Sequence, residues 1–267
     1  MKELASTPPV AGEAATLDAV PAGYLAFQVQ GSRVLARDWA AQAIRGALGS
    51  GTLYRWAAAQ KSPDIMQGRG ISYGVTLAAG AAGQSSTPVV VRRNRHGGLL
   101  RLLTGEQFLL PTRAPLELGI SARLIALGIP TPEVIACAVY PSAPLFGRSD
   151  VMTRRLPTGD DLPAVWKQAD AAGRESLIAE IAKLLRALTR AGAWHADLNL
   201  KNIYVTGEWA QAYLLDVDRV TFPKAADVAT LNYERLARSA RKWRERWGLD
   251  FCEDALAKLA SLALERT

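Results

Sequence analysis

The motif WHADLNLKN combines residue types that could transfer a phosphoryl group. Asp197 follows His195 by two positions, and Asn202 comes five residues after Asp197. Fourteen residues beyond Asn202, an apolar run ends in Asp216. This order of His, Asp and Asn, then an apolar strand and a further Asp, is typical of sites that transfer phosphate from ATP. In such sites an aspartate holds and deprotonates the attacking hydroxyl, while hard oxygen ligands hold Mg²⁺ on the triphosphate.

The motif assigns a role to each of these side chains. Asp197 is predicted to be catalytic, orienting the hydroxyl and accepting its proton, and Asn202 and Asp216 are predicted to bind Mg²⁺. Asp216 and Asp218 interrupt the end of an apolar strand, where an unpaired buried carboxylate would cost on the order of several kcal/mol. A bound cation would offset that cost, so Asp218 is expected as a further metal ligand. His195 is expected to brace the loop backbone instead of transferring protons.

A glycine cluster precedes the next predicted strand and is a candidate phosphate-binding loop. Gly68, Arg69 and Gly70 begin the spacing G-x-G-x-x-x-G, which Gly74 completes and which is one residue longer than the dinucleotide and kinase spacings. Glycine lets backbone N–H groups approach phosphates closely. A plain hairpin turn is the alternative interpretation. The position of the cluster before the next strand favours a loop over the ATP phosphates.

A basic strand and an acidic helix residue are expected to complete the nucleotide site. The β-branched run from 87 to 93 predicts a strand that ends in Arg92 and Arg93. Protein kinases carry a lysine on their third strand, and here Arg92, or alternatively Arg93, takes its place. Glu117 is the only acid of the predicted helix from 114 to 127 and could pair with that arginine, although a solvated glutamate is the alternative. Arginine can clamp phosphates with two N–H groups, but it is not interchangeable with lysine.

The composition is that of a globular chain with an anionic partner. Of its 267 residues 49% are hydrophobic and 21% charged, and this length is sufficient for one large domain or for two lobes that share a cleft. Lys and Arg exceed Asp and Glu by 7, which favours phosphate, nucleic acid or a membrane surface as partner. Cys137 and Cys252 are expected to be reduced thiols. The sequence contains no secretory signal and no run of the roughly 18–20 apolar residues that cross a bilayer, so we expect a cytoplasmic protein.

The order of the predicted elements indicates an α+β chain in two lobes, because strands come first and helices follow. Residues 1–22 are expected to be a mobile tail, 23–153 an N-lobe made of a small antiparallel sheet with one helix, and 154–267 a mainly helical C-lobe. Periodicity predicts further strands at 132–140, 148–155, 203–205 and 212–216, and further helices at 39–48, 174–191, 227–247 and 253–264.

The predicted helix from 227 to 247 carries much of the excess charge. From residue 233 onward it contains six basic and two acidic residues, and hence a net charge of +4. Leu236, Ala240, Trp243 and Trp247 form an apolar stripe on the opposite side. A basic helix is most often a solvated face, and this interpretation stays open beside a binding role.

Several of these segments together resemble the lipopolysaccharide kinase family. They are HADLNLKN at 195–202, LDVDR at 215–219 and RLARSARK at 235–242. The last two are specific, whereas the first is shared with many small-molecule kinases. Weaker matches are GRG at 68–70, a basic run from Arg92 that leads to HGG at 96–98, Glu117, and GIPTP at 128–132. Two residues depart from the family pattern: arginine replaces the third-strand lysine, and Val217 replaces an aromatic residue, a change expected to affect packing and not metal binding.

The resemblance, strongest toward the kinases of 3-deoxy-D-manno-octulosonic acid (Kdo), implies a protein-kinase-like fold and transfer of the ATP γ-phosphoryl group to Kdo on a lipid A precursor. It implies that Arg235 and Arg238 bind the carboxylate and phosphates of this acidic glycolipid. Asn199 is a further acceptor-binding candidate, and it argues against a protein substrate because eukaryotic protein kinases have lysine at its position. The other basic residues of the helix would hold the chain on anionic lipid at the cytoplasmic face of the inner membrane.

Three other functions stay open. A core heptose kinase and a kinase of the aminoglycoside or choline type carry the same catalytic-loop pattern. A pseudokinase that binds nucleotide without turnover is favoured by the missing third-strand lysine. A nucleic-acid partner is not expected, because the basic residues occur without any nucleic-acid-binding motif.

Overall fold

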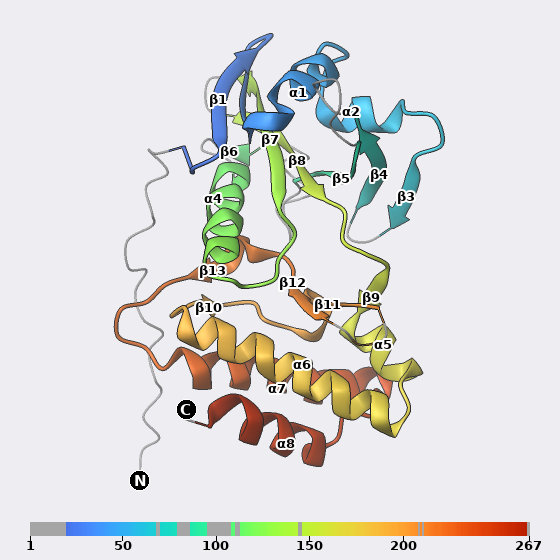
Figure 1. Cartoon of the computed structure of the whole chain (residues 1–267), viewed down its shortest axis with the longest axis vertical. Coiled ribbons are helices and arrows are strands. Elements are labelled where there is room, and N and C mark those ends of the chain that lie inside the picture. The colour runs from blue at the N-terminus through green and yellow to red at the C-terminus, as the bar shows by residue number, and fades with distance from the viewer. Residues whose placement is uncertain are drawn as a thin grey trace.

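The computed structural model shows two lobes, with a large sheet in the upper lobe and a layer of helices in the lower one (Figure 1). It describes residues 20–67, 70–78, 86–94, 108–109, 113–143, 146–207, 209 and 211–265. Residues 1–19 of the expected tail, and also Gly68 and Arg69, lie outside the described residues.

The upper lobe is built on one antiparallel sheet of eight strands. The strands are β1 (Tyr24–Val29), β2 (Ser32–Arg37), β3 (Asp64–Gln67), β4 (Ile71–Leu77), β5 (Thr87–Arg93), β6 (Phe108–Leu109), β7 (Val134–Ala143) and β8 (Phe146–Arg154). Their order is β1-β2-β7-β8-β5-β4-β3, and β6 pairs with β8. The central strands β7, β8 and β5 therefore lie between neighbours on both sides.

Helices pack on both faces of this sheet. The helix α4 (Arg113–Ala126) packs through Leu118 against Cys137 of β7 and Val151 of β8. On the other face, the short helices α1 (Ala41–Leu48) and α2 (Leu53–Ala58) share a core with Val89 and Val91 of β5. A single turn of 3₁₀ helix, η1 (Asp38–Ala40), precedes α1. The expectation of one helix in this lobe is therefore incomplete, because α1 was expected but α2 was not.

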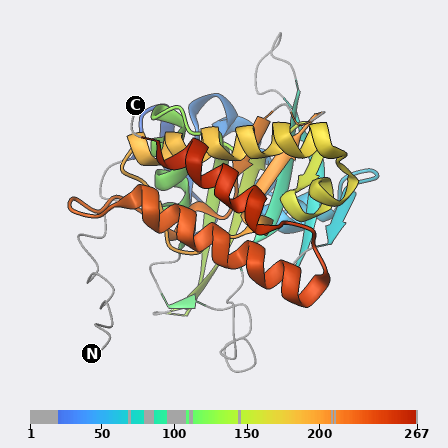
Figure 2. The same ribbon diagram turned by 90° about the horizontal axis from the view of Figure 1, so that it is seen from below.

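The lower lobe is mainly helical, with short strands at its top. Its elements are β9 (Gly159–Asp161), α5 (Leu162–Gln168), α6 (Ala171–Arg190), β10 (Trp194–His195), η2 (Leu200–Asn202), β11 (Ile203–Thr206), β12 (Gln211–Leu214), η3 (Val217–Arg219), β13 (Val220–Thr221), α7 (Val228–Trp247) and α8 (Glu253–Leu264). Seen from below, α6, α8 and α7 form a layer across the base of the molecule (Figure 2).

The sequence of α6 explains its central position in this lobe. Leu177, Ile181 and Leu188 recur at helical spacing and are fully buried in the core of the lower lobe. Asp170 caps the first turn by accepting a 2.8 Å hydrogen bond from the nitrogen of Gly173. The helix ends before Gly192, whose positive φ of 63° is typical of a residue just beyond a helix, and the motif at 195–202 follows.

The structure confirms the predicted fold class, an α+β chain in two lobes, and most of the predicted element boundaries. The strand predicted at 87–93 is β5, and the helix predicted at 114–127 is α4. The strand predicted at 212–216 is too long, because β12 ends at Leu214 and Asp216 adopts a left-handed backbone conformation. In the described part of the chain, no helix is long and apolar enough to cross a membrane.

Candidate active site

The loop between β10 and β11 (residues 196–202) is the predicted catalytic loop and is called the catalytic loop below. Two asparagine side chains hold it together. The side-chain amides of Asn199 and Asn202 each donate a 2.9 Å hydrogen bond to the backbone carbonyl of Asp197. The hydroxyl of Ser239 in α7 accepts a 3.1 Å hydrogen bond from the nitrogen of Leu200. These bonds fix the backbone on both sides of the Asp197 carboxylate. Asn199, which was predicted to bind the acceptor, thus stabilises the conformation of the loop.

His195 connects this loop to the segment that carries Asp216. Its Nδ1 accepts a hydrogen bond of 3.2 Å from the nitrogen of Asp197, and its Nε2 lies 3.3 Å from the carbonyl of Leu215. A neutral imidazole with the proton on Nε2 satisfies both contacts. Burial lowers the pKa of His195, which favours this neutral form. The contacts agree with the bracing role expected for His195.

A buried amide that was not among the predicted site residues holds the loop to α7. The side-chain oxygen of Asn232 in α7 accepts a 3.0 Å hydrogen bond from the nitrogen of His195, and its side-chain nitrogen donates a 2.9 Å bond to the carbonyl of Ala193. Asn232 is fully buried. One sequence signal could have indicated it, because Asn232 precedes Leu236 and Ala240 by four and eight residues and so lies on the apolar side of α7.

The three predicted metal ligands lie on neighbouring segments. The nitrogen of Leu215 donates a 2.8 Å hydrogen bond to the carbonyl of Asn202, so the residue that precedes Asp216 is held next to the catalytic loop. Asp216 has φ 56° and ψ 47°, a left-handed conformation that aspartate tolerates better than most residues, and it is exposed. Asp218 lies 3.3 Å from Nη1 of Arg113 in α4, a contact for which the sequence offered no signal.

These donors fit a magnesium ion that is also bound by phosphates. In the described residues, no three or more His, Cys, Asp or Glu side chains gather into a metal site. Mg²⁺ at a triphosphate commonly uses one or two carboxylates and completes its shell with phosphate oxygens and water. The nitrogen of the Asn202 amide is directed to Asp197, so its oxygen is the atom that can serve as a hard ligand beside Asp216.

Arg92 and Glu117 form an ion pair between β5 and α4. Nη2 of Arg92 bonds to Oε1 of Glu117, and Nη1 donates a 2.8 Å hydrogen bond to the side-chain oxygen of Asn94. Burial lowers the pKa of Arg92, but Glu117 reverses this effect and leaves the pKa raised, and Asp216 and Asp218 act in the same direction. Arg92 therefore lies close enough to both aspartates for their negative charges to favour its protonated form.

Arg93 points to the other face of the sheet. Its guanidinium lies over the ring of Tyr54 in α2, 4.2 Å from the ring centroid, and near the buried carboxylate of Asp150. Successive residues of a strand face opposite sides. Of the two arginines that the sequence left open, the structure places Arg92 beside Glu117.

The candidate phosphate loop is described only in part. Gly68 and Arg69 lie outside the described residues, and Gly70 directly precedes β4. Gly74 lies inside β4, where a Cβ atom would come within 3.1 Å of the Cβ of Asp64 and 3.3 Å of Nη1 of Arg155. Asp64 and Arg155 form an ion pair of 2.5 Å, so the small size of Gly74 makes room for a contact between β3 and the segment after β8.

The basic helix α7 contacts the catalytic loop directly. Nη2 of Arg235 donates a 2.5 Å hydrogen bond to Oδ1 of Asp197, and Nε of Arg235 is buried and has no hydrogen-bond partner. Arg238, the second predicted acceptor-binding residue, is exposed one turn further along. The structure thus brings the predicted catalytic aspartate and one predicted acceptor-binding arginine into contact.

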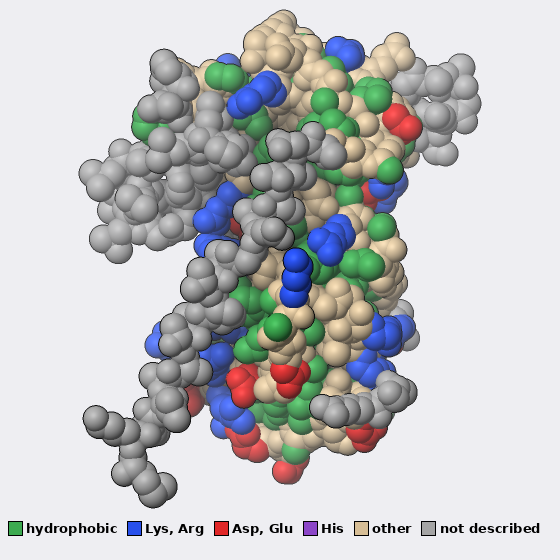
Figure 3. All heavy atoms as spheres, turned by 90° about the vertical axis from the view of Figure 1, so that its left-hand side faces the viewer, with side chains coloured by type: hydrophobic (Ala, Val, Ile, Leu, Met, Phe, Trp, Pro, Cys, Tyr) green, Lys and Arg blue, Asp and Glu red, His purple; other side chains and the backbone are tan. Residues whose placement is uncertain are grey.

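Other charged contacts surround this site. Lys201 of the catalytic motif forms a 2.6 Å ion pair with Asp161, which also caps α5. On the face shown in Figure 3, Lys and Arg side chains lie on both lobes and at the level between them. This distribution agrees with the anionic partner that the net charge predicts.

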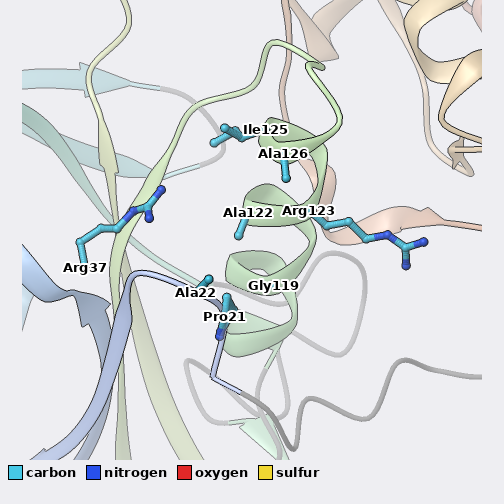
Figure 4. Close-up of a pocket in the computed structure, with 8 residues that line it drawn as sticks. All are labelled: Pro21, Ala22, Arg37, Gly119, Ala122, Arg123, Ile125 and Ala126. Carbon is cyan, nitrogen blue, oxygen red and sulfur yellow. The ribbon is translucent and has the colours of Figure 1, made fainter.

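A separate hollow of about 380 Å³ lies on the side of α4 that faces away from Glu117. Gly119, Ala122 and Ala126 of α4 line it together with Pro21 and Arg37 (Figure 4). The side chain of Arg123 extends away from it in Figure 4, and its guanidinium lies 3.5 Å from the ring centroid of Phe222. None of the predicted site residues lines this hollow.

Comparison with known proteins relates the whole arrangement to one family. The 3-deoxy-D-manno-octulosonic acid kinase of Vibrio parahaemolyticus is 26% identical over 72% of this chain and 81% of its own length, and that of Haemophilus influenzae is 27% identical over 77% and 86%. A solved structure of WaaP in complex with acyl carrier protein aligns over 80% of this chain and 83% of its own, with 14% identity and a TM-score of 0.47.

The family model described as lipopolysaccharide kinase (Kdo/WaaP) family matches residues 82–254. This match covers well over half of the chain and includes β5, α4, the catalytic loop and α7. ATP is the phosphoryl donor that a kinase family implies. The chain therefore belongs to the lipopolysaccharide kinase (Kdo/WaaP) family.

Proposed function

We propose that this protein transfers the γ-phosphoryl group of ATP to a hydroxyl of Kdo on a lipid A precursor. The observation that carries the proposal is the contact between Asp197 and Arg235. It places a candidate base beside a guanidinium that can bind a carboxylate through two hydrogen bonds. Kdo is an acidic sugar, so such a pair could hold the acceptor by its carboxylate while its hydroxyl lies at the base. The relatives from V. parahaemolyticus and H. influenzae are named as kinases of this sugar.

In the proposed reaction the acceptor oxygen attacks the γ-phosphorus as the bond from that phosphorus to the bridging oxygen breaks. ADP leaves, and the hydroxyl proton passes to the carboxylate of Asp197. Asn202 and Asp216 would hold Mg²⁺, with Asp218 as a further ligand once Arg113 has turned away. The ion would neutralise charge on the β- and γ-phosphates. Arg235, Arg238 and Asn199 would bind or position the acceptor.

The upper lobe supplies the proposed nucleotide contacts. Arg92, held by Glu117, would reach the α- and β-phosphates from the face of the sheet that looks toward α4. The predicted phosphate loop of Gly68, Arg69 and Gly70 would cover the phosphates. The nucleotide would then lie between an N-lobe of residues 23–153 and a C-lobe of residues 154–267.

The proposed acceptor also implies where in the cell the protein would work. Lipid A precursors are membrane lipids, so the protein would work as a cytoplasmic enzyme at the inner face of the inner membrane. The excess of basic residues on α7 supports attraction to an anionic lipid surface.

Phosphotransfer on defined acceptors tests the proposal. The protein would be incubated with radiolabelled ATP and Mg²⁺ and with Kdo-lipid A, heptosylated core or an aminoglycoside, and Asp197→Asn would serve as the inactive control. We expect label on Kdo-lipid A alone and none with Asp197→Asn. Label confined to heptosylated core would identify a heptose kinase and reject Kdo as the acceptor. Thermal stabilisation by ATP without label on any acceptor would identify a nucleotide-binding protein without turnover.

A further inference from the structure

Apart from Arg235, the basic residues of α7 divide into two groups by their contacts. Arg241 and Arg244 bond to Glu253 of α8 at 3.0 and 2.8 Å, and these bonds lower the pKa of Glu253 to about 2. The two guanidinium groups therefore share one carboxylate. Three other cations of α7 are exposed and form no ion pair within the part of the chain that the structure describes: Arg238, Lys242 and Arg246.

These three cations form one row along the helix. They are spaced four residues apart, and residues at that spacing lie almost above one another on a helix of 3.6 residues per turn. Arg235 begins the same row three residues before Arg238, at the point where it bonds to Asp197. From Arg235 to Arg246 the row rises by about 16 Å. A line of positive charge thus leads from the proposed base to the end of α7.

An aromatic pair lies at the end of α7 where this row ends. Trp247, the last residue of α7, is 51% exposed, which is unusual for so large an apolar side chain. Its ring centroid lies 4.4 Å from that of Trp243, which packs against the core of the lower lobe. The sequence predicted both as part of an apolar stripe, but Trp247 is largely in solvent. Indole rings favour the interface between water and lipid, where their apolar body and N–H group are both accommodated.

We infer that Lys242, Arg246 and Trp247, at the far end of this row, form a docking surface for a bilayer that contains anionic lipid. The unpaired cations match the negative charge of such a surface, and the exposed indole would enter the interface. The inference rests on the proposed function in one respect, because a lipid-anchored acceptor would come from the same bilayer. With the far end of the row on the bilayer, its other end holds Asp197 about 16 Å away along α7. The surface therefore sets the orientation in which the acceptor reaches the base.

Vesicle flotation of the full chain tests this surface. Vesicles of phosphatidylcholine with and without phosphatidylglycerol would be compared at low and high salt. The wild type should float with the anionic vesicles, and salt should weaken its binding. Each cation near an anionic surface contributes about a factor of five, so Lys242→Gln/Arg246→Gln should bind roughly 25-fold more weakly. The matched control is Lys167→Gln/Lys183→Gln, which removes the same charge from exposed positions of α5 and α6.

The role of Trp247 needs its own measurement. Trp247→Ala should weaken flotation without changing the net charge. The fluorescence difference between wild type and Trp247→Phe should shift to shorter wavelength when anionic vesicles are added. A difference spectrum that does not move would remove Trp247 from the docking surface.

Other results would overturn the inference as a whole. One is a wild type that does not float with anionic vesicles. The other is equal binding of Lys242→Gln/Arg246→Gln and the control variant. If a DNA oligonucleotide displaced the protein from vesicles while Trp247→Ala bound normally, the row would be a general polyanion site. Phosphorylation of a deacylated Kdo acceptor separates this inference from the proposed function. Lys242→Gln/Arg246→Gln should keep that activity, whereas a wild type that floats but labels no acceptor would reject the function and leave the surface intact.

Discussion

The side-chain oxygen of Asn232 accepts a 3.0 Å hydrogen bond from the backbone nitrogen of His195. The nitrogen of the same amide donates to the carbonyl of Ala193 at 2.9 Å. A carboxamide is suited to this position because it offers one donor side and one acceptor side. The start of the catalytic loop is therefore held by α7, a helix that follows it in the chain.

Replacing Asn232 should destabilise the protein. Asn232→Ala leaves two buried backbone groups unpaired, and each costs about 1–3 kcal/mol, so we expect a loss of about 2–6 kcal/mol in the free energy of unfolding. Thr230→Ala, in the same helix, removes a hydroxyl that bonds to Asp227 near solvent and should cost less than about 1 kcal/mol. Urea unfolding measures both. Equal stability of the two variants would contradict the proposed support.

Replacing Arg235 should weaken binding of the acceptor and leave binding of ATP unchanged. Arg235→Ala removes the guanidinium from Asp197, and we expect the KM for Kdo-lipid A to rise about tenfold or more, equivalent to about 1.4 kcal/mol. The KM for ATP should stay near the wild-type value. Arg235→Lys should retain part of the affinity for the acceptor, because lysine keeps the positive charge but lacks the planar guanidinium that binds a carboxylate through two N–H groups. Arg241→Ala, which removes an arginine bonded to Glu253 on the same helix, is the control.

Arg92 and Arg93 form a matched pair of adjacent arginines. Arg92→Lys cannot bond to Glu117 and Asn94 at once in the planar geometry of a guanidinium, so the KM for ATP should rise by about tenfold. Arg93→Lys changes a side chain on the opposite face of the sheet, over Tyr54, and should leave that KM nearly unchanged. Steady-state kinetics with varied ATP would decide, and a larger effect of Arg93→Lys would show that the nucleotide contacts the other face.

His195 makes stability depend on pH. Its pKa is lowered in the folded protein by burial, so below about pH 6.5, the ordinary value, the unfolded state binds more protons than the folded one. The contribution of neutral His195 is complete above that pH and is lost as the pH falls toward the folded pKa. Protonation of Nδ1 would also break its bond with the nitrogen of Asp197. Thermal unfolding between pH 5 and 8 should show this loss, and His195→Gln should flatten the curve by about 1.4 kcal/mol per pH unit at most.

Two glycines should respond in opposite ways to the same substitution. A Cβ on Gly159 would lie 2.0 Å from the carbonyl oxygen of Val205, so Gly159→Ala must separate β9 from β11 and should cost about 3 kcal/mol. A Cβ on Gly46 in α1 meets no atom within 4 Å, and Gly46→Ala should stabilise the helix by about 0.5–1 kcal/mol. Thermal unfolding of both variants gives the comparison. A Gly159→Ala protein as stable as wild type would show that β9 can shift freely.

The sequence predicted the parts of the site that depend on local spacing. The catalytic loop, the strand before Arg92 and the helix that carries Glu117 all follow from periodicity and motif order. The choice between Arg92 and Arg93 could not be predicted in this way. The alternation of side chains along a strand shows that the two arginines face opposite sides of the sheet, but not which side α4 covers. Val89 and Val91 pack beneath α1 and α2, and only this tertiary arrangement assigns the faces.

Other features are long-range and have no local signal. The contact of Arg113 with Asp218 joins residues 105 positions apart, and nothing near either residue specifies its partner. Asn232 was visible as a polar residue on an apolar stripe, but its hydrogen-bond partners in the catalytic loop were not. The end of β12 was placed too late because Leu215 continues the apolar run, whereas Asp216 turns the backbone into the left-handed region.

The loop that follows α4 is fastened to the lower lobe. The hydroxyl of Thr131 donates a 2.8 Å hydrogen bond to the carbonyl of Leu214, whose nitrogen donates a 2.8 Å bond to the carbonyl of Pro130. Arg123 over Phe222 adds a contact further up the helix. Although α4 lies between β6 and β7 in the sequence and packs on the sheet, these bonds couple its movement to the segment that carries the proposed metal ligands. A movement of the sheet relative to the lower lobe would then carry it across α4, and the ion pair of Arg92 and Glu117 is the contact that would have to stretch.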